Sequence, residues 1–476
     1  MRRIAIIGGG VAGAAVAGEL LRHGALDSIA LSWLVGRRAP GRGVAYSSAD
    51  DQHLLNVRAA NMGLFADDPS ALLRYAHEHG IAAQAKDFLP RSLFGDFAEH
   101  TVARLLRAHA AESCTIDLRS SEAVALRRRV GGGYTVRNED GTELCADHVV
   151  LALGAPPPQA LPEVTDRALA SGRYAVDPWQ LPRVVKAPQR VVVIGSGLSA
   201  VDAVLTASEQ WPDAQIVIVS RHGRLPGAHR DEPGAPYVRQ HELVETLQTR
   251  PDVAHWLRVL REAAHDSTDW RSVIDGLRPA TQRLWQSLDA VQRGRFLRHL
   301  RWIWDVARHR MAPQVAETLE LLRDAGRLEV FNGRVRSVDG TAPLQLIVRQ
   351  RSDGALQALT ADMVIQAVGF EPLTAETSHR LLRQIIADGE LCIDALGLGL
   401  DCAADGTPFR ADGKRAEGLH VIGSLLRGTL WECTALPEIR AAASRQADEL
   451  RRTSNNVTRL PDPSRHIDMA IRQIGT

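Results

Sequence analysis

Two glycine-rich turns stand out among the residues whose types and spacing could do chemistry. Their small positions are Gly8, Gly10 and Gly13 in the first turn and Gly195, Gly197 and Ala200 in the second. In this pattern the first glycine permits a tight turn, the second lets a pyrophosphate approach the backbone, and the third lets a helix pack closely on a strand. The phosphates then lie at a helix N-terminus, which favours anions. The spacing therefore predicts two dinucleotide sites.

The elements that must position these turns recur in the same order. A hairpin turning at Asp140-Gly141 follows the first turn, and the apolar strand ADHVVLALG then ends at Gly154. A hairpin turning at Asp353-Gly354 follows the second turn, and the strand ADMVIQAVG then ends at Gly369. Asp-Gly pairs suit a tight reversal between strands. We infer two modules of one design, and two dinucleotides in one chain indicate hydride transfer between them.

Length and charge limit the class of protein. A chain of 476 residues is too long for one ordinary core, so we expect two or three domains, with interleaving allowed. The 57 basic and 56 acidic residues balance, which leaves no overall field for nucleic acid or anionic lipid. No uninterrupted apolar run reaches the roughly 18 residues of a transmembrane helix. We expect a small-molecule partner, no nucleic acid and no membrane, and the oligomeric state stays open.

Cysteine and histidine patterns narrow the chemistry further. The five cysteines are odd in number and include no C-x-x-C pair, which disfavours a disulfide framework and a dithiol reductase and indicates a reducing cytoplasm. The segment HELVE lacks the second histidine of a zinc motif, and G-x-S-x-G does not occur. We therefore predict no metal site and no hydrolase. Glycines interrupt the apolar N-terminus, which argues against a secretory signal.

Five other segments are typical of one group of flavoproteins. They are GRGVAYS (41–47), HLLNVRAANM (53–62), DWRSVIDGLRP (269–279), RHRMAP (308–313) and RGTLWECTALPEIR (427–440). With the glycine turns, they make nearly the whole chain resemble the FAD/NAD(P)-binding flavoproteins with two dinucleotide-binding domains, which are related to class B flavin monooxygenases and amine N-hydroxylases. The resemblance implies an α/β fold with two Rossmann-like domains, the second inserted in the first. The implied ranges are 1–185 and 371–476 for the FAD-binding domain and 186–370 for the NAD(P)-binding domain, with a helical insertion over 235–325.

The resemblance also implies that the N-terminal module holds FAD. The residues that match this role are Gly8, Gly10, Gly13, Asn56, Met62, Gly154, Gly423 and Leu436. The sequence departs from related proteins at two points. No acidic residue between Asp27 and Asp50 ends the second strand to bind the adenosine ribose, and Ser424 stands where related proteins often carry an aspartate. Pro437 suits the first turn of a helix whose N-terminal dipole could stabilise negative charge on the reduced flavin.

The second module is expected to bind NADPH rather than NADH. Its second strand, AQIVIVS, runs into Ser220, Arg221 and Arg224 instead of the acidic residue that would accept a hydrogen bond from a ribose 2′-hydroxyl. These side chains could hold a 2′-phosphate, because guanidinium groups match phosphate geometry. The alternative interpretation is that both arginines are ordinary solvated loop charges.

Three residues are candidates for positions beside the flavin ring. Asn56 and Met62 lie in a segment that runs beside the ring in related proteins, and Arg91 stands where class B relatives carry an arginine near the cofactors. Met62 could instead pack in a core, and Arg91 could lie on the surface. We identify no catalytic side chain, because flavin and nicotinamide carry the hard steps of such reactions.

Residues 251–330 have no counterpart in a minimal two-domain chain. Within them, RFLRHLRWIWDVARHRM carries an apolar stripe at helical spacing, formed by Phe296, Leu300, Ile303, Trp304, Ala307 and Met311. Nearby tryptophans and arginines also permit a nucleic-acid surface. A packed helical insertion explains the stripe better, as a lid over the nicotinamide or a wall of an anionic substrate pocket.

These features predict a FAD-dependent monooxygenase that uses NADPH to oxygenate a small molecule at nitrogen, sulfur or carbon. The linker SGRYAVDPW (171–179) lacks the phenylalanine and histidine of the Baeyer–Villiger signature. Oxygenation at nitrogen or sulfur, or plain hydroxylation, is therefore no less well supported than ring oxygen insertion. Two alternatives stay open: a NAD(P)H-dependent flavin reductase or dehydrogenase that inserts no oxygen, and a non-catalytic nucleotide-binding redox sensor.

Overall fold

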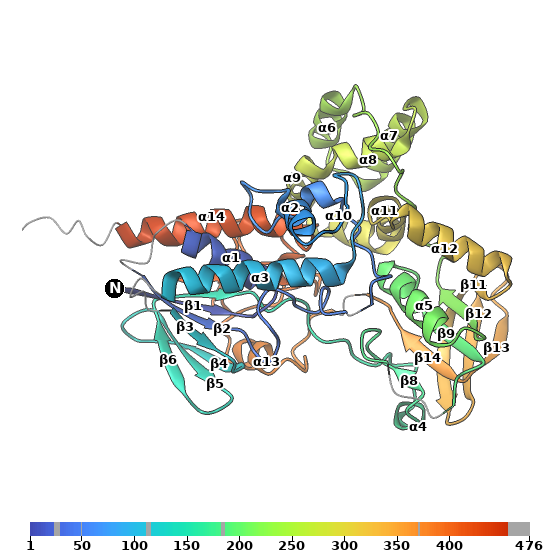
Figure 1. The fold of residues 1–476 in the computed structure, drawn as a ribbon, viewed down its shortest axis with the longest axis horizontal. Coiled ribbons are helices and arrows are strands. Elements are labelled where there is room, and N and C mark those ends of the chain that lie inside the picture. The colour runs from blue at the N-terminus through green and yellow to red at the C-terminus, as the bar shows by residue number, and fades with distance from the viewer. Residues whose placement is uncertain (23–28, 49, 111–115, 182–185, 370–371, 456–476) are drawn as a thin grey trace, which may run out of the picture.

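Two sheets and a helical lobe make up the computed structural model of the chain (Figure 1). The structure describes residues 1–22, 29–48, 50–110, 116–181, 186–369 and 372–455. In Figure 1 the first sheet and its helices lie on the left, the second sheet lies on the right, and the lobe stands above them. No helix within these described ranges is long and apolar enough to cross a membrane.

The first sheet draws its strands from both ends of the chain. Its order is β15-β7-β1-β2-β3, with all neighbours parallel. The strands are β1 (Arg2–Ile7), β2 (Ile29–Leu34), β3 (Ile116–Arg119), β7 (His148–Leu151) and β15 (Leu419–Val421). Because β15 follows the whole second module, that module is inserted in the first. The predicted fold class of two Rossmann-like domains, one interrupting the other, is confirmed.

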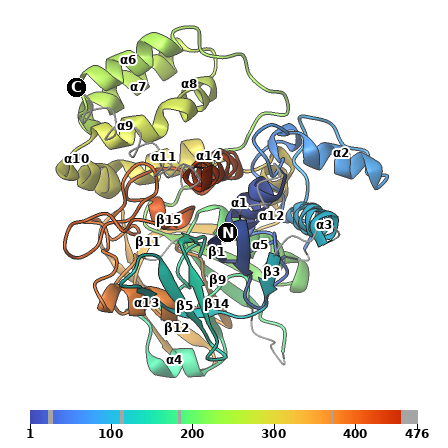
Figure 2. The same cartoon turned by 90° about the vertical axis from the view of Figure 1, so that its left-hand side faces the viewer.

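Helices and a small sheet cover the two faces of the first sheet. One face packs against α1 (Val11–Arg22), α3 (Arg91–Ala110) and α14 (Leu436–Asn455), with α2 (Ala71–Glu78) at their edge. The opposite face packs against β4 (Ala123–Arg128), β5 (Tyr134–Asn138), β6 (Glu143–Ala146) and α13 (Arg380–Ala387). Figure 2 shows α13 on the far side of the sheet from α1 and α14. Gly141, with φ +82°, forms the predicted turn between β5 and β6.

The second sheet repeats this plan with a longer third strand. Its order is β13-β12-β11-β10-β9-β14-β8. The strands are β8 (Tyr174–Ala175), β9 (Arg190–Ile194), β10 (Gln215–Ser220), β11 (Leu328–Gly340), β12 (Leu344–Gln350), β13 (Leu356–Ala361) and β14 (Met363–Gln366). One face packs against α5 (Leu198–Gln210) and α12 (Pro313–Asp324), and α4 (Asp166–Ala170) lies on the other. Since β8 pairs with β14, this sheet also takes in residues ahead of the expected boundary at 185.

The helical insertion folds into a lobe with its own apolar clusters. Its helices are α6 (Gln240–Thr249), α7 (Val253–Asp266), α8 (Trp270–Gly276), α9 (Thr281–Ser287), α10 (Ala290–Arg295) and α11 (Arg301–Arg308). The expected continuous stripe is interrupted, because a π-helical turn at Phe296–Leu300 separates α10 from α11. Met311 lies beyond the helix, bridged to Ala228 and buried in the core of the second module. Ala312, the residue before Pro313, is extended, as is usual before a proline.

Candidate functional site

The first glycine turn has the geometry of a phosphate cradle. Gly8 adopts φ +122°, and a Cβ built there would lie 2.2 Å from the carbonyl oxygen of Ala152. A Cβ at Gly13 would lie 2.0 Å from the carbonyl oxygen of Gly8. No side chain fits at either position, and α1 begins at Val11 directly after the turn. The unpaired N–H groups of its first turn therefore face the turn.

The backbone geometry of the second turn is nearly the same as that of the first. Gly195 adopts φ +121°, and its Cβ would lie 2.1 Å from the carbonyl oxygen of Ala367. The backbone N–H of Gly195 donates to Val219 at 2.9 Å, as that of Gly8 donates to Leu34 at 2.9 Å. Ala200 is fully buried where α5 packs on the sheet. The sequence prediction of two equivalent turns is met by two equivalent backbones.

Both cradles have room for a pyrophosphate. A Cβ built at Gly197 would meet no atom within 4 Å, and the same holds at Gly154 and Gly369, the residues that close the two modules. A Cβ at Gly10 would meet only the Cα of Gly43, at 3.6 Å. The glycines that a pyrophosphate must approach are therefore not covered by side chains, and the residues present fit a dinucleotide in each module.

A strap from the GRGVAYS segment crosses the first cradle. The backbone N–H of Gly41 donates to the carbonyl oxygen of Gly9 at 2.8 Å, and Gly43, with φ +61°, faces Gly10. Arg42 fixes the strap to α3 through ion pairs with Asp96 and Glu99. The first cradle is therefore enclosed by the chain that follows its second strand.

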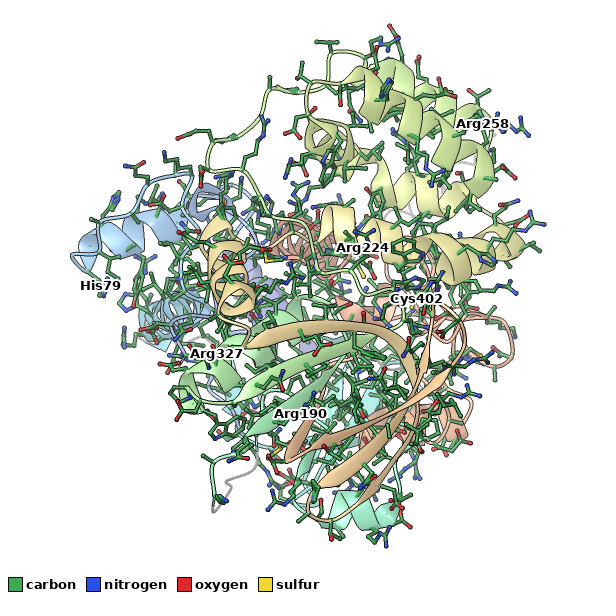
Figure 3. The ribbon with its side chains drawn as sticks, turned by 90° about the vertical axis from the view of Figure 1, so that its right-hand side faces the viewer. His79, Arg190, Arg224, Arg258, Arg327 and Cys402 are labelled. Atoms are coloured by element: carbon green, nitrogen blue, oxygen red, sulfur yellow. The ribbon has the colours of Figure 1, made fainter. Side chains whose placement is uncertain are left out.

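The loop after β10 carries the residues expected to hold a 2′-phosphate. The Ser220 hydroxyl accepts a hydrogen bond from the N–H of Gly223 at 3.0 Å, which fixes the turn. Arg221 and Arg224 are exposed, and no carboxylate pairs with either guanidinium in the described structure. Figure 3 shows Arg224 beyond the carboxyl end of the second sheet, beneath the lobe, whereas Arg190 and Arg327 mark the amino end. Both predicted arginines are thus free to bind an anion.

Two of the residues expected beside the flavin have buried side chains. The side chains of Met62 and Leu436 are each 1% exposed and pack in the apolar cluster between the first sheet and its helices. Core packing was the alternative interpretation for Met62, and contact of either residue with the flavin stays a prediction. Asn56 is half-buried at the junction of the modules, and Gly423, with φ +82°, lies beside Ala12 at the start of α1.

Arg91 is neither a surface residue nor a free cation. Its guanidinium forms an ion pair with Asp202 on α5 at 3.0 Å and lies 5.6 Å from the ring centroid of Trp179. Burial raises the pKa of Asp202, and Arg91 opposes that shift. His53 is also buried here, with Nε2 2.8 Å from the Thr206 hydroxyl of α5. These contacts hold the two modules against each other on the linker side.

Three of the five segments typical of the group, 269–279, 308–313 and 427–440, meet at one junction. Arg308 Nε donates to buried Glu432 at 3.1 Å, and Trp304 Nε1 donates to the same carboxylate at 2.7 Å. Arg278 holds Glu438, in the first turn of α14, at 2.5 and 2.7 Å. The lobe is therefore joined to the C-terminal part of the first module by buried ion pairs.

Glu432 is held in an unusual backbone conformation. Among the described residues it is the only one other than glycine with a positive φ, at +60°. Such strain persists where surrounding contacts over-determine it, and it clusters at functional sites. The contacts here come from Arg308 and Trp304, so the lobe fixes the chain four residues before α14 begins.

A second set of contacts joins the lobe to the loop of the first module that carries Asn56. Arg310, which is 2% exposed, binds Asp275 with one nitrogen at 2.6 Å from both carboxylate oxygens and donates to His229 Nδ1 at 3.3 Å. His229 Nε2 in turn donates to the carbonyl oxygen of Asn56 at 3.2 Å. Burial, and then Arg310, lower the pKa of His229 to about 4, so the imidazole is neutral at pH 7. The loop that carries Asn56 is thereby tied to the lobe.

One face of α11 presents titratable groups that water can reach. Asp305 lies 3.4 Å from Arg301 and 3.7 Å from His309, and all three side chains are about two fifths exposed. Surrounding protein raises the pKa of Asp305 and lowers that of His309. Both shifts favour the neutral forms. A carboxyl and an imidazole poised in this way can give and take a proton.

Sequence reasoning did not single out Glu432, Arg308, Arg310, Asp305 or His309. The signal was present, because the first three lie in the quoted segments RHRMAP and RGTLWECTALPEIR, and so does His309. What was missing is their mutual contact, which depends on how the lobe folds back. No cluster of His, Cys, Asp or Glu suited to a metal ion occurs in the part of the chain that the structure describes.

Comparisons with known proteins agree with this geometry. The family described as FAD-NAD(P)-binding matches residues 5–156. The L-ornithine N(5)-monooxygenase of Burkholderia cepacia is 25% identical over 209 residues, which are 43% of this chain and 39% of that protein. The match thus spans about two fifths of the length of this curated relative.

Solved structures cover far more of the chain. The ornithine N-hydroxylase of Kutzneria sp. 744 superposes with a TM-score of 0.64 at 16% identity, covering 94% of this chain and 99% of that one. The L-lysine 6-monooxygenase of Pseudomonas syringae superposes with a TM-score of 0.62 at 15% identity, covering 94% and 99%. At these identities the likeness concerns the fold. The chain has the fold of the FAD/NAD(P)-binding flavoproteins with two dinucleotide-binding domains, the fold it shares with the amine N-hydroxylases.

Proposed function

We propose that the protein is a FAD-dependent monooxygenase that uses NADPH to oxygenate a small molecule, with an amine nitrogen as the first acceptor to test. The observation that carries the proposal is the pair of matching cradles. One is enclosed by a strap, as suits a resident cofactor, and the other is open beside two free arginines, as suits an exchanging one. The shared fold with ornithine and lysine hydroxylases supports the amine.

Each cofactor has a set of residues that would hold it. FAD would bind over Gly8, Gly10 and Gly13 under the strap at 41–47, and NADPH would bind over Gly195 and Gly197. When bound, nicotinamide supplies a hydride and the reduced flavin activates molecular oxygen. The overall balance is substrate, NADPH, a proton and O₂ giving oxygenated substrate, NADP⁺ and water.

The chain's own residues position these groups and exclude water. The ion pairs of Glu432 and Glu438 hold the lobe over the junction of the two modules, which limits the access of bulk water there. Arg91 and Asp202 fix the modules on the linker side. Asp305 and His309 would hold and move a proton at the carboxyl oxygen and at Nε2.

A thiol relay through Cys402 and Cys433 is not supported. Cys402 and Cys433 are buried, and burial raises the pKa of the Cys433 thiol to about 12. A thiolate is the reactive form of cysteine, so these side chains are poor nucleophiles near pH 7. Free cysteines also fit the reducing cytoplasm that we propose as the compartment.

Oxygen consumption tests the proposal directly. The purified protein, loaded with FAD, would be mixed with NADPH, and oxygen uptake and coenzyme oxidation would be followed with ornithine, lysine, cadaverine and other amines in turn. We expect amine-dependent oxygen uptake with a hydroxylamine product. Turnover without oxygen, on an artificial acceptor only, would instead identify a reductase, and bound FAD without turnover would identify a sensor.

A further inference from the structure

A tryptophan of the lobe stacks on the coenzyme loop of the second module. The rings of Trp302, in α11, and His222, in the loop after β10, are parallel within 9°, with their centroids 4.4 Å apart. Both side chains are partly exposed. No other aromatic pair in the described structure joins the lobe to this loop. The contact is therefore specific to the place where the lobe meets the second cradle.

This place is the adenosine end of a dinucleotide site. In Rossmann-like modules the residues that follow the second strand bind the ribose next to adenine. His222 lies between Arg221 and Arg224 in that segment, and Arg351 donates to the carbonyl oxygen of Arg221 at 3.4 Å. An aromatic ledge thus stands beside a group of guanidiniums. That combination matches a purine ring carried next to a phosphate.

The elements that carry His222 and Trp302 are both held in place by contacts with other parts of the protein. A Cβ built at Gly223, with φ +57°, would lie 2.9 Å from the Asn332 side chain, so the loop is seated tightly on β11. In α11, Trp304 and Arg308 bind the buried carboxylate of Glu432. Trp302 is therefore presented by a helix that is itself anchored to the first module. A ring held in this way loses little freedom when a ligand stacks on it.

We propose that Trp302, together with His222, is a coenzyme-binding residue that stacks on the adenine ring of the nicotinamide coenzyme. The inference rests on the proposed function, because it takes the second cradle as the NADPH site. It gives the lobe a binding role in addition to covering the junction. The adenine is common to NADPH and NADH, so Trp302 contributes to affinity and the arginines to the choice between the two coenzymes.

The test compares three coenzymes on three variants and the unaltered protein. Dissociation constants of NADPH, NADH and reduced nicotinamide mononucleotide, which lacks the adenosine end, would be measured on FAD-loaded W302L, W302F, R224A and unaltered protein. W302L should weaken NADPH and NADH alike, by about tenfold, in line with the usual worth of a base–aromatic stack. W302F keeps a ring and should restore most of the affinity. Binding of the mononucleotide should not change.

A matched control removes a different indole from the same lobe. Trp256, in α7, donates to the carbonyl oxygens of Leu247 and Arg250 rather than contacting the coenzyme loop. W256L should therefore leave all three dissociation constants unchanged. FAD content and melting temperature, measured for every variant, identify any protein that has not folded.

The outcomes separate this inference from the proposed function. If R224A selectively weakens NADPH while W302L binds both dinucleotides normally, Trp302 does not contact the coenzyme and the second cradle still does. If W302L weakens the mononucleotide as much as NADPH, Trp302 acts by shaping the lobe, and the stacking proposal is overturned. If unaltered protein binds neither dinucleotide, the proposed function itself fails.

Discussion

The two cradles share one backbone geometry but differ in what covers them. In the first, the strap at 41–47 bonds to Gly9 and places Gly43 against Gly10. In the second, no atom lies within 4 Å of a Cβ built at Gly197, and the nearby loop meets the lobe through a ring stack. A fingerprint of glycines thus defines where phosphates bind, whereas the chain after the second strand decides whether the ligand is enclosed.

The enlarged connections occupy the same topological place in both modules. In the first, residues 35–90 separate β2 from α3, and in the second, residues 221–312 separate β10 from α12. The two connections meet: Arg58 of the first donates to the carbonyl oxygens of Arg230 and Asp231 in the second, at 2.7 and 3.0 Å. Each module therefore contributes an enlarged connection between its second strand and the next helix of the module. The two connections pack together at the candidate site.

Substitutions of the cradle glycines should have the largest effects, and each cradle should lose a different cofactor. Gly197→Val adds a side chain in open space, so the protein should fold and retain FAD but lose measurable NADPH binding, because the branched side chain occupies the phosphate position. Gly10→Val should instead yield a colourless protein that cannot be loaded with FAD. Flavin absorbance and coenzyme titration measure both results. A Gly197→Val protein that loses FAD and keeps NADPH would reverse our assignment of the cradles.

Sequence reasoning reached the cradles because their signals are local. Glycines with φ near +120°, such as Gly8 and Gly195, are required by the backbone within a few residues. The resemblance to other flavoproteins, not a local signal, placed Met62 and Leu436 at the flavin, and the side chains of both are buried in the core. Their burial depends on α1, α3 and α14, which lie far apart in the sequence.

The contacts at the junction could not be predicted from the sequence either, because they also join residues that are far apart in the chain. Arg308 and Glu432 are separated by 124 positions, and only the folded lobe brings their side chains to 3.1 Å. The interruption of the apolar stripe in the lobe was not predicted either. A π-helical turn at 296–300 keeps the apolar composition but changes the helical register. The sequence therefore predicts the glycine turns, which depend on neighbouring residues, but not the contacts that tertiary packing makes.

Removing the Glu432 carboxylate should separate the lobe from the first module. Glu432→Ala leaves Arg308 buried without its partner, and breaking one side of a buried ion pair costs about 3 to 5 kcal/mol. Glu432→Gln keeps an acceptor for Trp304 and should cost less. Urea unfolding measures both variants, and the double variant Glu432→Ala, Arg308→Ala should lose less than the sum of the single changes. Additive losses would show that the pair does not couple the lobe to the first module.

Acid should weaken the first sheet more than the second. His420 in β15 is buried, its Nε2 lies 3.3 Å from Nδ1 of His148 in β7, and burial lowers its pKa to about 4. In the unfolded chain His420 binds a proton near pH 6.5, whereas in the folded chain it binds one only near pH 4. The free energy of unfolding should therefore fall as the pH drops through this window, by about 3 kcal/mol at its lower end.

His420→Gln should reduce that pH dependence and leave the part contributed by His229, whose pKa burial also lowers to about 4, while His241→Gln, at an exposed position of α6, should leave it unchanged. The described strands of the second sheet contain no histidine, so the second sheet supplies no comparable titration. Unfolding curves from pH 7 to pH 4 make the comparison. A slope that His420→Gln leaves intact would assign the acid sensitivity to other groups.

The smallest effect is expected at the arginines that follow the second strand of each module. Arg37 follows β2, and its exposed guanidinium is held by Glu139 at 2.9 Å, whereas Arg221 and Arg224 follow β10 and pair with no carboxylate in the described structure. An exposed pair of this kind contributes little to stability or binding. Arg37→Ala should therefore change the affinity for FAD by less than about twofold, as measured by reconstitution of the apoprotein. A loss of FAD of tenfold or more would show that Arg37 leaves Glu139 to bind the flavin's adenosine, and the two loops would then use arginine for the same purpose.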